Sequence, residues 1–87
     1  MNPKIKSNIS WQRIEDEVLI MDTAYQKKAH SLNSTASFIW EHCNGTNSIE
    51  DIAKLLSDNY ETNLAESTED VKEVINQLKS FDLLESF

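Results

Sequence analysis

The chain has 87 residues, with 15 acidic and 8 basic side chains and a formal net charge of −7. A chain of this length forms one domain around a single small core, which excludes the deep cleft of an ordinary enzyme. The acidity argues against nucleic acid as the main partner, because a protein that binds phosphates needs a basic face. The charge is uneven: residues 1–40 carry five basic and four acidic side chains, and residues 41–87 carry three and eleven.

Cys43 is the only cysteine, so an internal disulfide is excluded and a reducing compartment is favoured. No apolar run approaches the roughly 20 residues of a membrane span. Residues 1–10 lack the apolar stretch of a signal peptide. We therefore expect a cytoplasmic protein with a flexible N-terminus over residues 1–8 and one domain over residues 9–87.

The first half of the chain is predicted to form strands. Residues 9–14 alternate as a strand does, and Trp11 on this strand belongs either to the core or to a partner surface. The acidic residues 15–17 suit a turn, and residues 18–21 are an apolar run of strand length. A third strand is expected at residues 28–32, where the alternation is weak. Three short strands with short connections predict an antiparallel meander.

A helix is predicted directly after the strands. Asn33 suits its N-cap, because the side chain can accept a hydrogen bond from a free amide of the first turn. We expect the helix to stop at Asn44-Gly45, where glycine can adopt the left-handed cap conformation. The apolar residues of this segment follow the spacing of one helix face: Ala36, Ile39, Trp40 and Cys43.

Two further helices are predicted from capping signals and apolar stripes. Ser48 followed by Asp51 resembles a capping box, and Ser67 followed by Asp70 repeats it. Residues 81–87 are short and apolar and are expected to pack back on the domain. The second stripe consists of Ile49, Ile52, Ala53, Leu56 and Tyr60, and the third of Val71, Val74, Ile75 and Leu78. We expect the core to contain Leu32, Ile39, Trp40, Ile52 and Leu56.

The sequence offers no convergent catalytic groups. His30 and His42 have no partner at metal-binding spacing, and His42 and Cys43 are neighbours on a helix, so they point about 100° apart. The carboxylates cluster at helix starts, where they complement the helix dipole. One glycine cannot form a phosphate-binding loop. We therefore predict no metal, no cofactor and no catalytic residues.

Binding is the remaining class of function. A three-stranded meander has free edges, and an edge strand presents unpaired N–H and C=O groups that can pair with an extended peptide. The edge at residues 28–32 leads into the first helix. An equally good interpretation of Lys27 and Lys28 is that they only protect this edge from aggregation.

The segment from His30 to Glu41 resembles the PqqD family, named for the pyrroloquinoline quinone biosynthesis protein D. The family usually has Gly where this chain has Asp82, and often has a Gly-Lys-Tyr-Tyr-like strand near residues 26–29. The matching pieces follow one another in the family's order: Leu32-Asn33-Ser34-Thr35-Ala36, Ile39-Trp40, Asn44-Gly45, Ser48-Ile49-Glu50-Asp51-Ile52-Ala53, Tyr60, Glu69-Asp70-Val71, Leu78 and Leu83-Leu84.

The resemblance implies an α+β, winged-helix-like fold with a three-stranded antiparallel sheet packed on three helices. It also implies a non-catalytic recognition element for ribosomally synthesised and post-translationally modified peptides. Such domains, including the B1 type of lasso-peptide pathways, bind a precursor's leader peptide as an added strand. They present the precursor to a leader peptidase, a cyclase or a radical S-adenosylmethionine (SAM) enzyme. The resemblance names neither the peptide nor its modification.

The resemblance also suggests which residues bind the peptide. The third strand would supply Lys28, Ala29, His30 and Ser31, and the third helix would supply Val71, Lys72, Val74, Ile75, Leu78 and Lys79. The apolar members of the helix set are equally the core face of an amphipathic helix. The alternative function is a winged-helix DNA-binding regulator, against which stand the acidic residues of the third helix.

Overall fold

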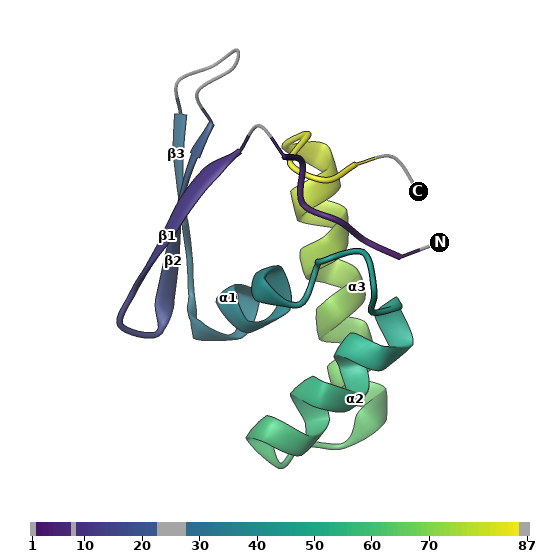
Figure 1. Cartoon of the computed structure of the whole chain (residues 1–87). Coiled ribbons are helices and arrows are strands. Elements are labelled where there is room, and N and C mark those ends of the chain that lie inside the picture. Colours follow the sequence, from purple (N-terminus) through teal and green to yellow (C-terminus); the bar gives the residue numbers. More distant parts are fainter. Residues whose placement is uncertain (1, 8, 23–27, 86–87) are drawn as a thin grey trace.

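The computed structural model describes residues 2–7, 9–22 and 28–85. Three strands form one antiparallel sheet in the order β1-β2-β3, and the helices lie on one side of it (Figure 1). The elements are β1 (Ser10–Ile14), β2 (Glu17–Asp22), β3 (Lys28–Leu32), α1 (Ser34–Glu41), α2 (Ile49–Tyr60) and α3 (Leu64–Ser80). The predicted α+β architecture is therefore confirmed.

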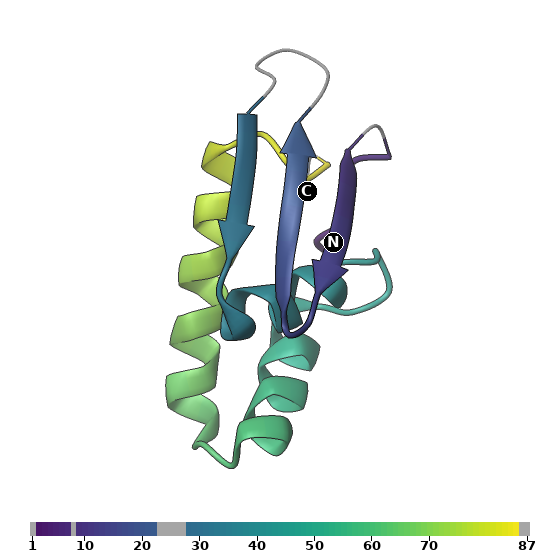
Figure 2. The same cartoon turned by 90° about the vertical axis from the view of Figure 1, so that its left-hand side faces the viewer.

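The register of the sheet divides the strand residues between two faces. Ile20 of β2 lies between Trp11 of β1 and His30 of β3, and the neighbouring inward position of β2 is Val18. Val18 and Ile20 are buried against the helices. Because successive side chains on a strand point to opposite faces, Leu19 and the residues paired with it point away from the helices. Figure 2 shows this outer face, with β3 at one edge and α3 running behind it.

A buried hydroxyl joins the sheet to the first helix. Ser37 of α1 is fully buried, accepts a hydrogen bond from the Val18 N–H at 2.7 Å, and donates to the Leu32 carbonyl at 3.1 Å. Val18 and Leu32 are partners across β2 and β3. The hydroxyl therefore bridges the two strands where they meet α1, and it shows that the Val18 N–H and the Leu32 carbonyl point toward each other's strand.

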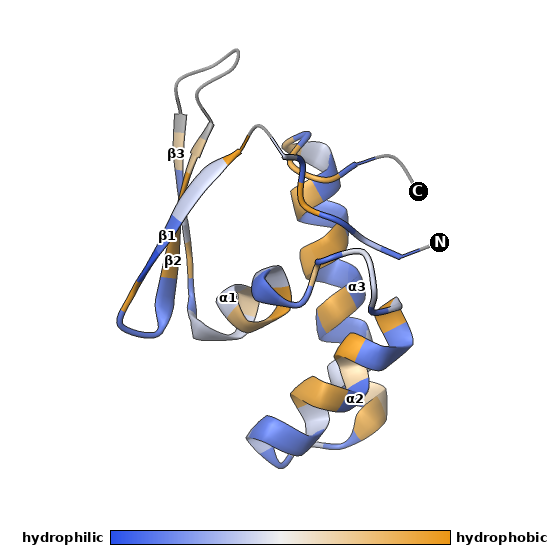
Figure 3. Cartoon of the chain, viewed as in Figure 1, coloured by the Kyte–Doolittle hydropathy of each residue, from blue (hydrophilic) through white to orange (hydrophobic). Residues whose placement is uncertain are grey.

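The core lies between the sheet and the three helices. The predicted core residues Ile39, Trp40, Ile52 and Leu56 are at most 2% exposed, and Leu32 is partly buried against them. Trp11 is 37% exposed and meets Trp40 edge to face, with ring centroids 5.9 Å apart. It thus covers the core and also reaches the surface. The ribbons of α2 and α3 alternate between hydrophilic and hydrophobic, as expected for helices with one buried face (Figure 3).

Two of the predicted caps are confirmed. The Asn33 side chain accepts from the Ala36 N–H at 2.9 Å at the start of α1. Ser48 and Asp51 form a reciprocal capping box at the start of α2, with both hydrogen bonds at 3.0 Å. The side chains of Asn33 and Ser48 therefore mark where α1 and α2 begin, as the sequence predicts.

The predicted start of the third helix is wrong. The helix begins at Leu64, because Asn63 is the N-cap and its side chain accepts from the Glu66 N–H at 2.8 Å. Ser67 lies inside the helix, is fully buried, and has its hydroxyl 2.7 Å from that of Thr62. Two capping signals compete here, and the earlier one allows another turn of helix to form.

The predicted stop of the first helix also needs correction. α1 ends at Glu41 with His42 as its C-cap, at φ −94°, so the cap is not left-handed. Gly45 does have φ +87°, but it lies in the connection to α2. There the Lys4 side chain packs close to its Cα, since a Cβ added at Gly45 would be 3.2 Å from Lys4 Cδ.

Both ends of the described chain pack on the domain. Ile5 pairs with Leu84 in an isolated antiparallel bridge, and the Lys6 N–H donates to the Leu83 carbonyl at 3.1 Å. Leu83 and Leu84 are buried, which confirms the expected packing of the C-terminal segment up to residue 85. Asp82 takes the left-handed conformation at φ +59°. Residues 1, 8, 86 and 87 lie outside the described range, and the flexibility of residues 1–8 stays a prediction.

Candidate functional site

Within the described part of the chain, the backbone groups on the outer edge of β3 have no hydrogen-bond partner. Because the Ser37 hydroxyl links the Val18 N–H to the Leu32 carbonyl, the backbone groups of Leu32 face β2. Backbone groups alternate sides along a strand, so those of His30 also face β2, and those of Ala29 and Ser31 face away from the sheet. Ala29 and Ser31 are exposed. Each therefore presents one N–H and one C=O on which another extended chain can pair.

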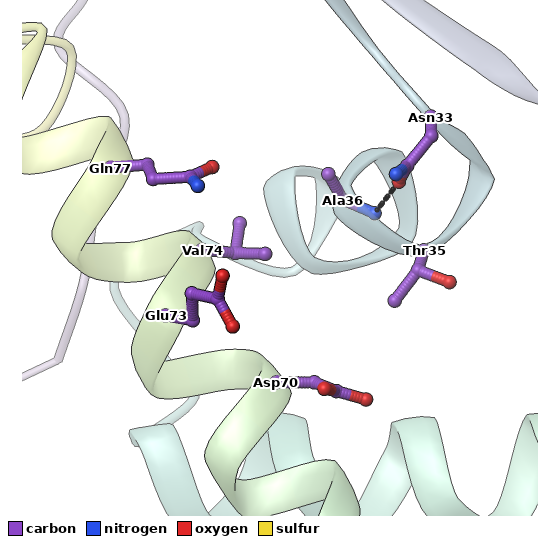
Figure 4. A pocket seen from close by; sticks show the side chains of 7 residues that line it. All are labelled: Asn33, Thr35, Ala36, Asp70, Glu73, Val74 and Gln77. Carbon is purple, nitrogen blue, oxygen red and sulfur yellow. Dashed lines mark hydrogen bonds between the residues drawn. The ribbon is translucent and has the colours of Figure 1, made fainter.

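The backbones of β3 and α3 do not touch, and the strip between them is called the groove; it runs from a cavity between α1 and α3 to the contact of His30 with Phe81. In the described part of the chain, every Cα atom of β3 lies more than 8 Å from every Cα atom of α3. The first turn of α1 closes the end of this space next to Leu32. There a cavity of about 320 Å³ opens between α1 and α3 (Figure 4), lined by Asn33, Thr35, Ala36, Asp70, Glu73, Val74 and Gln77.

The cavity combines an apolar floor with negative charge. Ala36 is buried and Val74 half-buried, and Figure 4 shows the Val74 side chain directed from α3 toward α1. Asp70 and Glu73 are exposed, and among the described residues neither carboxylate has a hydrogen-bond or ion-pair partner. The cavity is therefore suited to a side chain with an apolar stem and a positive end.

An aromatic contact marks the other end of the groove. The His30 ring, on the inner face of β3, stacks on the Phe81 ring beyond the end of α3, with centroids 4.7 Å apart and planes 30° apart. Phe81 is 48% exposed. The groove thus has an aromatic end and an acidic end, which gives it a direction.

Some of the residues predicted for the site lie at the β3 edge or the cavity, and others lie in the core. Ala29 and Ser31 lie on the free edge, His30 faces the groove, and Val74 lines the cavity. The backbone of Lys28 belongs to β3, and its side chain lies outside the described structure. The three other apolar residues of α3 are in the core at 2% exposure or less and do not face the groove: Val71, Ile75 and Leu78.

The two predicted lysines lie elsewhere on α3. The groove face of the helix carries Asp70, Val74 and Gln77. At about 100° per residue, Lys72 and Lys79 project from the opposite side. The prediction that they contact a peptide in this groove therefore has no support from the geometry. The charge on the groove face is negative.

Some lining residues were not predicted as site residues. On α3 these are Asp70, Glu73 and Gln77, which with Val74 follow the spacing i, i+3, i+4 and i+7 of a second helix face. The apolar stripe of the sequence predicts the neighbouring face of α3, which packs in the core. At the start of α1 the unpredicted lining residues are Asn33, Thr35 and Ala36; Asn33 was predicted only as the cap and Ala36 only as part of the apolar helix face.

The neighbouring His42 and Cys43, directly after the end of α1, have structural roles. Cys43 is fully buried, its Sγ lies 3.2 Å from the Ile39 carbonyl oxygen, and burial raises the pKa of its thiol to about 12. His42 Nδ1 lies 2.8 Å from the Phe38 carbonyl oxygen. Within residues 2–7, 9–22 and 28–85, no three His, Cys, Asp or Glu residues are grouped to hold a metal ion. No described helix is long and apolar enough to span a membrane.

Comparison with protein families identifies the chain. Residues 17–84 match the model of the coenzyme PQQ synthesis protein D (PqqD) family. The chain belongs to the PqqD family. The match runs from the start of β2 to the buried Leu84, so it includes β3, α3 and the groove between them. A comparison with curated proteins gives no significant match.

Solved structures share this fold over nearly the whole chain. TbiB1 in complex with the TbiA(beta) leader peptide has a TM-score of 0.86 at 21% identity, covering 97% of this chain and 96% of that one. A lasso peptide synthetase B1 complexed with the leader peptide has a TM-score of 0.85 at 20% identity, covering 99% and 100%.

A third structure is the PqqD truncation of Methylobacterium extorquens PqqCD, a stand-alone recognition element for ribosomally synthesised and post-translationally modified peptides. It has a TM-score of 0.78 at 17% identity, covering 97% of this chain and 88% of that one. At these identities the likeness shows that the fold is shared.

Proposed function

We propose that this PqqD-family protein recognises the leader peptide of a ribosomally synthesised and post-translationally modified peptide. The leader adds to the free edge of β3 as a fourth strand, and the domain then presents the precursor to a separate modifying enzyme. The domain itself catalyses no reaction. Fold relatives with bound leader peptides support this role.

The observation that carries the proposal is the orientation of the β3 backbone. Since the Leu32 backbone groups face β2, the N–H and C=O groups of Ala29 and Ser31 face the free edge, and a cavity that admits side chains opens between α1 and α3. Main-chain pairing provides affinity in strand addition, and pockets for alternate side chains provide specificity.

The orientation of the bound leader follows from the sheet. The three strands are antiparallel, and we propose that the leader continues this pattern. β3 runs toward α1, so the N-terminal part of the bound stretch would lie over the cavity of Asp70 and Glu73. Its C-terminal part would leave past His30.

DNA binding fits the same surface poorly. A winged-helix regulator would insert α3 into a groove of DNA, but the accessible face of α3 beside the sheet carries Asp70 and Glu73. These carboxylates repel phosphates. The same two carboxylates attract a basic side chain of a bound peptide.

Titration with the precursor encoded near the gene tests the proposal. We expect submicromolar binding of the precursor and of its isolated leader, and no binding of the core peptide alone. Binding that survives deletion of the leader would contradict the proposal, as would chemical change of the precursor in the absence of another enzyme.

Substitution on the strand edge locates the peptide. Ala29→Pro removes an outward N–H without removing a hydrogen bond to β2, so it should weaken leader binding more than folding. His30→Pro is the matched control, because it removes an N–H that faces β2 and should destabilise the sheet itself. Unchanged leader affinity in a folded Ala29→Pro variant would move the site away from β3.

A further inference from the structure

The outer face of the sheet is uncovered and partly apolar. All three helices lie on the other side of the sheet (Figure 1). The outer patch, defined as Ile14, Leu19 and Met21, lies on β1 and β2, with Ile14 54% exposed, Met21 42% exposed and Leu19 half-buried. A small protein seldom leaves several large apolar side chains together on one face unless that face binds something.

Among the described residues, the charged side chains that line the hollow beside the outer patch are acidic. Glu15 and Glu17 line a hollow of about 180 Å³ together with Ile14, Leu19 and Ser31. Arg13 lies close by, since its Nε donates to the Glu15 carbonyl oxygen at 2.9 Å, but its ion pair is with the carboxylate of Glu41 on α1. A protein that covers this patch therefore needs an apolar contact flanked by basic side chains. A second copy of this chain is disfavoured, because association would bring together two chains of net charge −7.

The outer patch is also continuous with the free edge of β3. Across the sheet from Leu19 and Met21 stand Ser31 and Ala29, whose side chains are small. A strand added to β3 would turn every second side chain to this same outer face. Because Ala29 and Ser31 are small, they do not separate the outward side chains of an added strand from the outer patch. One partner could therefore contact both surfaces.

We propose that the outer patch docks the modifying enzyme, through an apolar surface flanked by Lys or Arg. The enzyme contacts the patch and the outward side chains of the bound leader together, so the leader raises the affinity of the domain for the enzyme. This inference rests on the proposed function, which supplies the modifying enzyme as the partner, and its cooperative part also requires that the leader binds β3.

The test uses the purified modifying enzyme encoded beside the gene for this chain, with the leader affinity measured separately. Ile14→Glu and Met21→Glu should each lower enzyme affinity at least tenfold and leave leader affinity within twofold. Leu64→Glu is the matched control, because Leu64 is also 54% exposed but lies at the start of α3. It should change neither affinity.

Charge reversal tests the electrostatic part. Glu17→Lys should slow association with the enzyme and reverse its dependence on salt, whereas Glu69→Lys on α3 should not. Enzyme affinity within twofold of wild type in both patch variants would overturn the proposal. So would an equal loss in Leu64→Glu, absence of enzyme binding with and without leader, or a wild-type dimer that Ile14→Glu dissociates. Failure of leader recognition would appear separately, as absence of leader binding by the wild-type chain.

Discussion

At the scale of single residues, one hydroxyl joins β2, β3 and α1 beside the candidate site. Ser37 is buried and satisfies both the Val18 N–H and the Leu32 carbonyl. Without it, the buried Val18 N–H and the partly buried Leu32 carbonyl would lose this partner, and proteins rarely leave buried backbone groups unpaired. The bridge also shows that the Leu32 backbone faces β2, from which the outward direction of the Ala29 and Ser31 backbone groups follows.

Replacing this hydroxyl should therefore destabilise the domain. Ser37→Ala is expected to lower the free energy of unfolding by about 1–3 kcal/mol, the cost of leaving buried polar groups unpaired. Urea denaturation measures the change. Ser80→Ala is the control, because its hydroxyl bonds Gln77 at an exposed position. A loss no larger than that of the control would mean that β2 and β3 bond directly once the hydroxyl is gone.

The burial of Cys43 predicts how its thiol reacts and how its contribution to stability depends on pH. The thiolate is the reactive form, and burial raises the pKa of this thiol to about 12 from an ordinary value of 9.0. A thiol reagent at pH 8 should therefore label the native protein far more slowly than the urea-unfolded chain. Because the folded pKa is the higher one, the stability that this thiol contributes is complete below pH 9.0 and is lost as pH rises toward 12. Equal labelling rates would contradict burial of the thiol.

At the scale of elements, α3 presents two faces with different roles. Val71, Ile75 and Leu78 fill the core, whereas Asp70, Glu73, Val74 and Gln77 line the groove. The apolar stripe of the sequence predicted the first face. The second face was missed as a site because its acids also suit an ordinary solvated helix surface.

The groove acids should select the charge of the peptide. Asp70→Asn and Glu73→Gln should each weaken binding of a leader with a basic residue toward its N-terminal end by about two- to fivefold, as for partly exposed ion pairs. The effect should shrink at high salt. Glu69→Gln, outside the groove lining, is the control for net charge. Tighter binding in the groove variants would show that the leader places an acidic residue here.

The sequence predicts features that depend on neighbouring residues better than features that depend on tertiary packing. Residues 28–32 were predicted as β3 with the bounds that the structure has, and Asn33 and Ser48 were correctly predicted as caps. The start of α3 was wrong because two capping signals lie four residues apart and tertiary packing buries Ser67. The Ser37 bridge and the cavity depend on how α1 sits against the sheet and α3, which no local pattern encodes.

At the scale of the whole molecule, ligand binding and stability are coupled. The domain has one small core and a free sheet edge. An added strand would pair with the free backbone groups of β3 and cover the groove. A ligand that binds only the folded state stabilises it by about 2.7 kcal/mol at 100 times its dissociation constant. In a domain of this size that corresponds to a rise in melting temperature on the order of 10 °C or more.

Thermal unfolding with and without peptide measures this coupling. The leader should raise the melting temperature and slow amide exchange at Ala29 and Ser31, whose N–H groups face the free edge. Exchange at His30 should change less, because its N–H already faces β2. The core peptide should change neither, and Ala29→Pro should reduce the leader's effect on melting. A leader that stabilises the domain without protecting the Ala29 and Ser31 amides must bind elsewhere, because pairing with the β3 edge engages those two N–H groups directly.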